Sequence, residues 1–193
     1  LFQALDGAGI RVVSAVLAFF NFPITCQGAN LAFRKAAYMQ VRKSVLLLGK
    51  TKGNREWLMQ EMKNQTEWGI KPTIHPHTLG FTHSPKTWSG MINQRSRWAS
   101  TGKDYSSAMV KLYLGVIFLS ILSFISTIFI LPFADASHIL LIKAITDFAV
   151  ALGVVTIIQQ PFLMLAFPIA FILQPLFIII TGVLGTLNLY KWK

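Results

Sequence analysis

Polar and apolar positions divide the chain into a mixed first part and an almost wholly apolar second part. From Leu112 to Ala134, 23 consecutive residues carry no charge and are rich in Leu, Ile and Phe. At 1.5 Å per residue this stretch can cross a bilayer core of roughly 30 Å, so it predicts a transmembrane helix over 112–134. Two further apolar stretches predict spans over about 139–158 and 162–189.

Each of the two later spans is interrupted. Lys143 and Asp147 stand four residues apart, where they can pair on one helix face; an ion or substrate pathway is the alternative. Pro168 and Pro175 predict that the last stretch is kinked or broken into two short pieces. Three simple spans would leave the basic end of the chain outside, against the positive-inside tendency. We therefore expect either that the last stretch re-enters or that one span does not cross.

The first part has the pattern of a domain that lies against a membrane. Residues 8–22 are apolar with a single charge and predict an interfacial helix. Residues 56–68 predict a second helix, and a third is expected from near Pro85 towards the first span. Residues 70–79 are β-like, with two prolines that confine them to an edge or irregular strand. The predicted fold is therefore α+β over residues 1–105, followed by a transmembrane region over 106–193.

Charge narrows the choice of partners. The chain carries a formal net charge of +11, and 15 of its 18 Lys and Arg residues lie at or before Lys111. Such a basic region suits nucleic acid, the cytoplasmic face of an anionic membrane, or a diphosphate. The last two fit the apolar second half, and we expect no nucleic acid. Cys26 is the single cysteine, which fits a reducing compartment. Because the chain starts at Leu1 rather than Met, we interpret it as a fragment.

The segment from Asn93 to Trp98 is the most informative for chemistry. On a helix, Gln94, Arg97 and Trp98 occupy positions i, i+3 and i+4, so an amide, a guanidinium and an indole share one face. A guanidinium suits bidentate pairing with phosphate oxygens, and an indole ring stacks on the apolar face of a sugar. The alternative is a basic helix beside the membrane whose Trp anchors at the interface.

Gln94-x-x-Arg97-Trp98 resembles the Q-x-x-R-W motif of membrane-bound family-2 glycosyltransferases, such as the cellulose and hyaluronan synthases. In that family too the motif stands just before a transmembrane span. The upstream segment 25–34 resembles the family's donor-site segment. The resemblance implies that Gly28 and Asn30 shape the donor-sugar pocket, because glycine allows close backbone approach and asparagine tolerates turn geometry.

The resemblance also implies the remaining roles. Gln94 and Arg97, with Arg95 as a neighbour, would contact the nucleotide diphosphate, and Trp98 would form the stacking floor for the acceptor sugar. A divalent metal, Mg or Mn, is expected in the full-length enzyme, with its D-x-D ligands and the nucleotide-binding half upstream of this chain. We expect no metal site within the chain itself.

One departure from the family pattern concerns the catalytic base. The family's acidic pair falls here on Asn54 and Arg55, neither of which can accept a proton as a base. Glu56 is then the candidate base; alternatively it is a first-turn residue that the helix dipole favours.

Taken together, these features predict a multi-pass protein of the plasma (inner) membrane with a cytoplasmic catalytic part. Its expected activity is inverting transfer of a sugar from a nucleotide-sugar donor to a glycan or lipid-linked acceptor, in cell-envelope polysaccharide synthesis. The fragment alone is expected to be inactive. The alternatives are a catalytically inactive homologue that serves as a membrane-bound partner protein, and a small channel or transporter subunit, for which Lys143 and Asp147 are too few polar groups.

Overall fold

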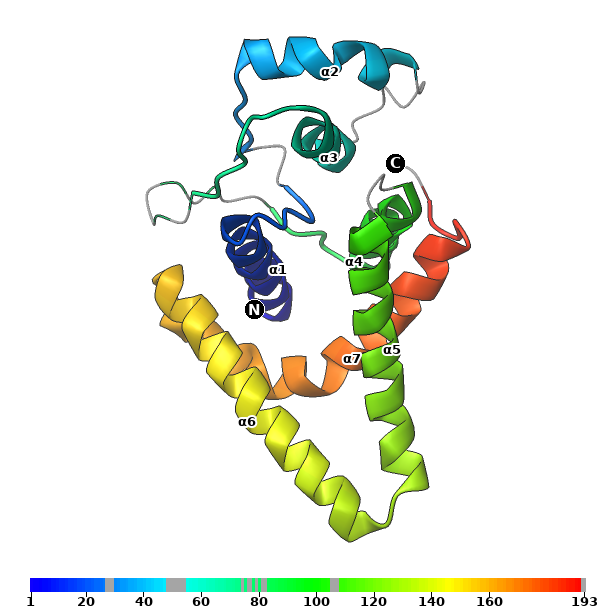
Figure 1. Cartoon of the computed structure of the whole chain (residues 1–193). Helices are drawn as coiled ribbons and strands as arrows, with labels where there is room; N and C mark the ends of the chain where they lie inside the picture. The colour runs from blue at the N-terminus through cyan, green and yellow to red at the C-terminus, as the bar shows by residue number, and fades with distance from the viewer. Residues whose placement is uncertain are drawn as a thin grey trace.

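The computed structural model describes residues 1–26, 30–47, 55–73, 75, 78, 80, 83–104 and 108–191. Helices account for most of these residues (Figure 1). In chain order they are α1 (Phe2–Phe19), α2 (Lys35–Leu47), α3 (Arg55–Gln65), α4 (Trp88–Ser100), η3 (Thr101–Asp104), α5 (Ala108–Ile130), α6 (Phe133–Ile157), η4 (Pro161–Ala166) and α7 (Phe167–Thr186), where η marks a short 3-10 helix.

The predicted α+β fold class is wrong. The part of the chain that the structure describes forms helices and no strand. The β-like segment is the source of the error: its described residues 70–73 lie outside any regular element. Pro72 and Pro76 each lack a backbone N–H, which removes two ladder donors from a ten-residue segment. Helix α2, which the sequence analysis did not predict, packs against α3 through Val41 and Met62.

Helices α5 and α6 form a hairpin that narrows to a turn at Leu131 and Pro132 (Figure 1). They match the first two predicted spans, with boundaries shifted by a few residues. Most of their large apolar side chains are exposed, as expected for helices surrounded by lipid. Among the described residues, four segments are long and apolar enough to cross a membrane: α1, α5, α6, and η4 with α7. The chain therefore has the helices of a membrane protein.

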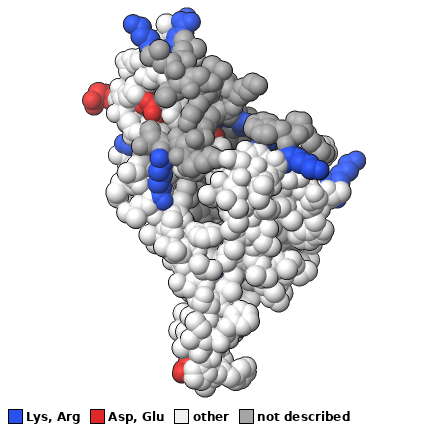
Figure 2. Space-filling view, turned by 90° about the vertical axis from the view of Figure 1, so that its right-hand side faces the viewer, with Lys and Arg blue, Asp and Glu red and all other residues white. Residues whose placement is uncertain are grey.

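Charge is distributed as this assignment requires. On the face shown in Figure 2, Lys and Arg side chains lie over the wide upper part of the molecule. The tapering lower part of that face, where the α5–α6 hairpin lies, is formed by uncharged residues except for an acidic side chain at its tip. A surface of this kind places the taper in hydrocarbon and the basic part at one membrane surface.

Helix α1 runs across the direction of the hairpin. In Figure 1 it is seen nearly end on, whereas α5 and α6 lie in the plane of the picture. Phe2, Leu5 and Val12 pack against α6, η4 and α7, so one side of α1 is buried in the core. Helix α1 begins earlier than expected, at Phe2. It is long and apolar enough to cross a membrane, so its interfacial placement stays a prediction.

The last apolar stretch consists of η4 followed by α7, with Pro175 inside α7. It starts where α6 ends, opposite the hairpin turn, and its far end lies beside α4 (Figure 1). The Ser100 hydroxyl donates to the Tyr190 hydroxyl at 3.0 Å, and the Lys191 backbone N–H donates to the Asn93 side chain at 3.4 Å. Because α4 leads into α5 on this same side, α7 returns to the side from which it started. The structure thus favours re-entry over a third crossing.

Lys143 and Asp147 form an ion pair on α6, which confirms the predicted pairing. The Lys143 ammonium also lies 5.0 Å from the ring centroid of Phe124 on α5 and 4.9 Å from that of Phe171 on α7. The pair therefore joins three helices, and this favours a structural role over a pathway.

Candidate functional site

Helix α4 carries the motif and is held firmly at both ends. At its start, Thr87 is the N-cap, and its hydroxyl accepts a hydrogen bond from the Gly90 N–H at 3.1 Å. Towards its end, α4 packs closely on α7 at Gly185, where a Cβ atom would lie 2.8 Å from the Ala99 Cβ and 2.9 Å from the Ser100 nitrogen. This contact fixes the orientation of the motif relative to the membrane helices.

The structure brings Gln94, Arg97 and Trp98 together on one face of α4, as their spacing predicts. Gln94 and Arg97 are half-buried. Trp98 exposes 42% of its surface, even though α4 has a buried side on which a tryptophan could pack. An exposed indole beside an amide and a guanidinium is a surface that can stack on a sugar and bind an anion.

Arg95 lies differently from the expectation for a diphosphate contact. It exposes only 9% of its surface and forms an ion pair with Asp6 of α1. Its guanidinium carbon lies 4.4 Å from the ring centroid of Trp98, on the same helix. Arg95 therefore supports the ring of Trp98 from within the protein, and its guanidinium has no open surface for a ligand.

Glu56 lies in the first turn of α3, the place that the helix-dipole alternative predicts. The Thr25 hydroxyl donates a hydrogen bond to its Oε1 atom at 3.4 Å. Burial, together with the negative charge of Glu56, raises the pKa of the Cys26 thiol to about 12. The structure thus places Glu56 beside the start of segment 25–34, so the candidate base and the candidate donor segment are neighbours.

Gly28 and Asn30 are the residues of the expected donor-sugar pocket. Gly28 lies outside the described residues, as does Asn54 at the position of the family's acidic pair. Asn30 is exposed, and its side-chain amide donates to the Thr78 carbonyl at 2.8 Å. This hydrogen bond joins the segment around Asn30 to the segment that precedes α4, so the Asn30 side chain has a structural role here.

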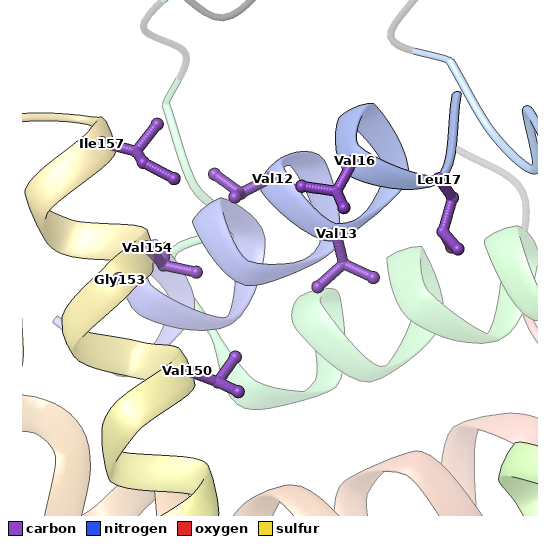
Figure 3. Close-up of a pocket in the computed structure, with 8 residues that line it drawn as sticks. All are labelled: Val12, Val13, Val16, Leu17, Val150, Gly153, Val154 and Ile157. Carbon is purple, nitrogen blue, oxygen red and sulfur yellow. The ribbon is translucent and has the colours of Figure 1, made fainter. Parts of the chain in front are cut away.

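Two cavities lie away from the motif. The larger, about 240 Å³, is lined by aliphatic side chains and Gly153 between α1 and α6 (Figure 3). The smaller, about 190 Å³, lies between α1, α6 and α7 and includes Asp6, Asp147 and Gln174. Neither includes a residue of α3 or α4. In the described residues, the candidate site is therefore an exposed helix face rather than an enclosed pocket.

Metal ligands were not expected within the chain. Among the described residues no three His, Cys, Asp or Glu side chains come together in a way that could hold a metal ion. The divalent metal expected in the full-length enzyme would have its ligands outside this chain, and it stays a prediction.

The sequence analysis missed Asp6. Asp6 is an acidic residue inside an otherwise apolar segment, and a carboxylate in such surroundings needs a charged or hydrogen-bonding partner. This pattern could have marked Asp6 in the sequence. That partner is Arg95, 89 residues further along the chain.

No protein-family model, curated protein or solved structure matches the chain.

Proposed function

We propose that this chain is the membrane-side part of a glycosyltransferase that moves a sugar from a nucleotide-sugar donor to a glycan or lipid-linked acceptor. The observation that carries the proposal is the face of α4 formed by the half-buried Gln94 and Arg97 and the exposed Trp98, shortly before the first span. It combines groups that bind a diphosphate with a ring that stacks on a sugar.

Each group has a distinct part in the proposed reaction. The amide of Gln94 and the guanidinium of Arg97 hold the leaving diphosphate, and the indole of Trp98 supports the acceptor sugar. Glu56 accepts the proton of the attacking acceptor hydroxyl. The new bond forms between that oxygen and the anomeric carbon as the bond from this carbon to the diphosphate breaks, with inversion.

The position of α4 relative to the membrane supports this assignment. Nucleotide sugars are charged and water-soluble, whereas a lipid-linked acceptor or a growing glycan is held at the membrane. A helix face at the basic end of a membrane-spanning hairpin is accessible both to a soluble donor and to an acceptor held at the membrane. The bias of Lys and Arg to that end favours the cytoplasmic side of the plasma (inner) membrane.

A second candidate, a catalytically inactive homologue acting as a membrane-bound partner, is favoured by a specific feature. Asn54 and Arg55 stand where the family has an acidic pair. Arg55 is exposed at the start of α3, next to Glu56. Neither an amide nor a guanidinium can accept a proton as a base, so the chain lacks the family's acidic pair at this position.

The test measures nucleoside diphosphate release by the full-length protein in detergent, with a panel of nucleotide sugars and a divalent metal. Trp98→Ala and Glu56→Gln probe the site. Trp88→Ala, a second exposed Trp on α4, and Glu67→Gln, an exposed Glu beyond α3, are the matched controls.

We expect release to fall at least tenfold in both site variants and to stay near wild type in both controls. If release falls with Trp98→Ala but not with Glu56→Gln, the transferase proposal stands and Glu56 is not its base. Absence of release by the wild-type protein with every donor overturns the proposal in favour of the inactive partner protein.

A further inference from the structure

Asp6 and Arg95 form a buried contact between two helices far apart in sequence. Their side chains expose 4% and 10% of their surfaces. Burying both charges is costly unless they stay paired, so the contact strongly constrains the position of each group. Helix α1 is thereby fixed to α4 at the centre of the motif.

Within the part of the chain that the structure describes, the Arg95 guanidinium hydrogen-bonds to Asp6 alone. Its Nη2 atom donates to Asp6, whereas Nε and Nη1 are buried and make no hydrogen bond to the described residues. A buried charge that loses its one charged partner is strongly unfavourable, so the guanidinium stays against Asp6. The carboxylate of Asp6 is therefore what holds this guanidinium in place.

Arg95 in turn supports the indole of Trp98. The two residues are three positions apart on α4, and the guanidinium carbon lies 4.4 Å from the ring centroid. A cation held over the face of an indole is attracted to it, most strongly where water is excluded. Trp98 therefore presents one face to Arg95 and keeps 42% of its surface exposed.

From this chain of contacts we propose that Asp6 is a positioning residue, which sets the orientation of the Trp98 ring through Arg95. Its consequence for turnover rests on the proposed function. With the ring held, the acceptor sugar meets a preformed stacking surface; with the ring free, binding must first order it. Loss of Asp6 then raises the KM for the acceptor more than it lowers kcat.

Because Asp6 lies on α1, its contact with Arg95 also links α4 to the helices that pack on α1. Helix α1 packs on α6 and α7, whose outer surfaces face lipid. The Asp6–Arg95–Trp98 chain thus connects the membrane-contacting helices directly to the acceptor-stacking ring.

The direct test is ¹⁹F NMR of full-length protein that carries 5-fluorotryptophan, with the Trp98 resonance assigned by Trp98→Phe. Asp6→Asn removes the charge at nearly constant volume. Asp135→Asn makes the same change at an exposed carboxylate near the hairpin turn and is the matched control. The buried Trp57 of α3 serves as an internal reference.

We expect Asp6→Asn to shift or broaden the Trp98 resonance while that of Trp57 stays unchanged, Asp135→Asn to shift neither, and Asp6→Glu to restore much of the wild-type spectrum. If Asp6→Asn does not fold, the pair Asp6→Leu with Arg95→Met removes both charges and is expected to displace the same resonance. An unchanged Trp98 resonance in a folded variant that lacks Asp6 overturns the proposal.

Kinetics separate this inference from the proposed function. In an active protein, Asp6→Asn is expected to raise the acceptor KM about tenfold with a smaller change in kcat, which a loss of folded protein alone would not produce. A displaced Trp98 resonance in a protein without any transferase activity retains the positioning role and overturns only the proposed function.

Discussion

Replacing Gly185 by Ala tests whether close packing of α7 on α4 holds the motif. A Cβ atom at this position would lie 2.8 Å from the Ala99 Cβ, 2.9 Å from the Ser100 nitrogen, and closest of all to the Ser96 carbonyl oxygen. Two of these three neighbours are backbone atoms, so a change of rotamer cannot relieve the clash. The helices must separate instead.

The magnitude follows from two opposing effects. Overpacking costs about 1–3 kcal/mol, and backbone neighbours place this site near the upper value. Alanine regains about 1 kcal/mol of helix propensity relative to glycine. The net destabilisation is therefore about 2 kcal/mol, which for a chain of this length lowers Tm by about 4–8 °C.

Thermal unfolding of the purified protein in detergent measures the effect. Gly115→Ala on α5 and Gly153→Ala on α6 are matched controls, because a Cβ atom at either position has no neighbour within 4 Å. We expect both controls to unfold at or slightly above the wild-type temperature. A Gly185→Ala protein as stable as the controls would refute the close α4–α7 packing.

Three further predictions follow from individual contacts. Asp6→Leu leaves Arg95 buried and unpaired and is expected to cost about 3–5 kcal/mol in unfolding free energy, whereas combining it with Arg95→Met recovers most of this cost. In the double-mutant cycle of Asp6→Leu and Arg95→Met, additive effects would contradict the pair. Thr87→Ala removes the N-cap of α4 and is expected to cost about 1 kcal/mol in thermal unfolding, whereas Thr87→Ser costs little; equal stabilities would contradict the cap. Glu56→Gln removes the negative charge that helps to raise the pKa of Cys26 towards 12, so the thiolate fraction at pH 9 rises. Peptide mass spectrometry should then show faster alkylation of Cys26, and an unchanged rate would contradict the proximity of Glu56.

Elements with a strong local signal could be predicted from the sequence. The helix expected over 56–68 is α3, although it ends at Gln65, three residues earlier than expected. The third predicted helix is α4, with the motif on one face. The first span begins four residues before its predicted start because Lys111 was taken as its limit; a lysine near a helix end can extend its charge to the interface.

The second span also begins earlier than predicted, for a local reason. The predicted span starts at residue 139, but the N-cap of α6 is Pro132 and Asp135 lies in the first turn, where the helix dipole favours an acid. Polarity alone did not distinguish a loop from the first turn of a helix.

Contacts between distant segments could not be predicted from local patterns. Nothing in the spacing of residues indicates that Asp6 pairs with Arg95, or that α7 returns to α4 at Gly185. The roles of Gln94, Arg97 and Trp98 were drawn from residue chemistry and a resemblance, and they stay predictions. The structure adds the arrangement that presents these three residues on one exposed face.

The central claim, that this face of α4 holds a nucleotide diphosphate, is tested most directly by calorimetric titration of the full-length protein with a nucleoside diphosphate. Arg97→Ala is compared with Arg97→Lys, which keeps the positive charge but loses the bidentate hydrogen bonding of the guanidinium. The control is Lys86→Ala, which removes an exposed cation just before α4. A charged hydrogen bond contributes about 1.5–3 kcal/mol, so Arg97→Ala is expected to weaken binding by roughly 10–150-fold and Lys86→Ala to leave it nearly unchanged. Binding of equal strength in wild type and Arg97→Ala, or none to the wild-type protein, would contradict the account.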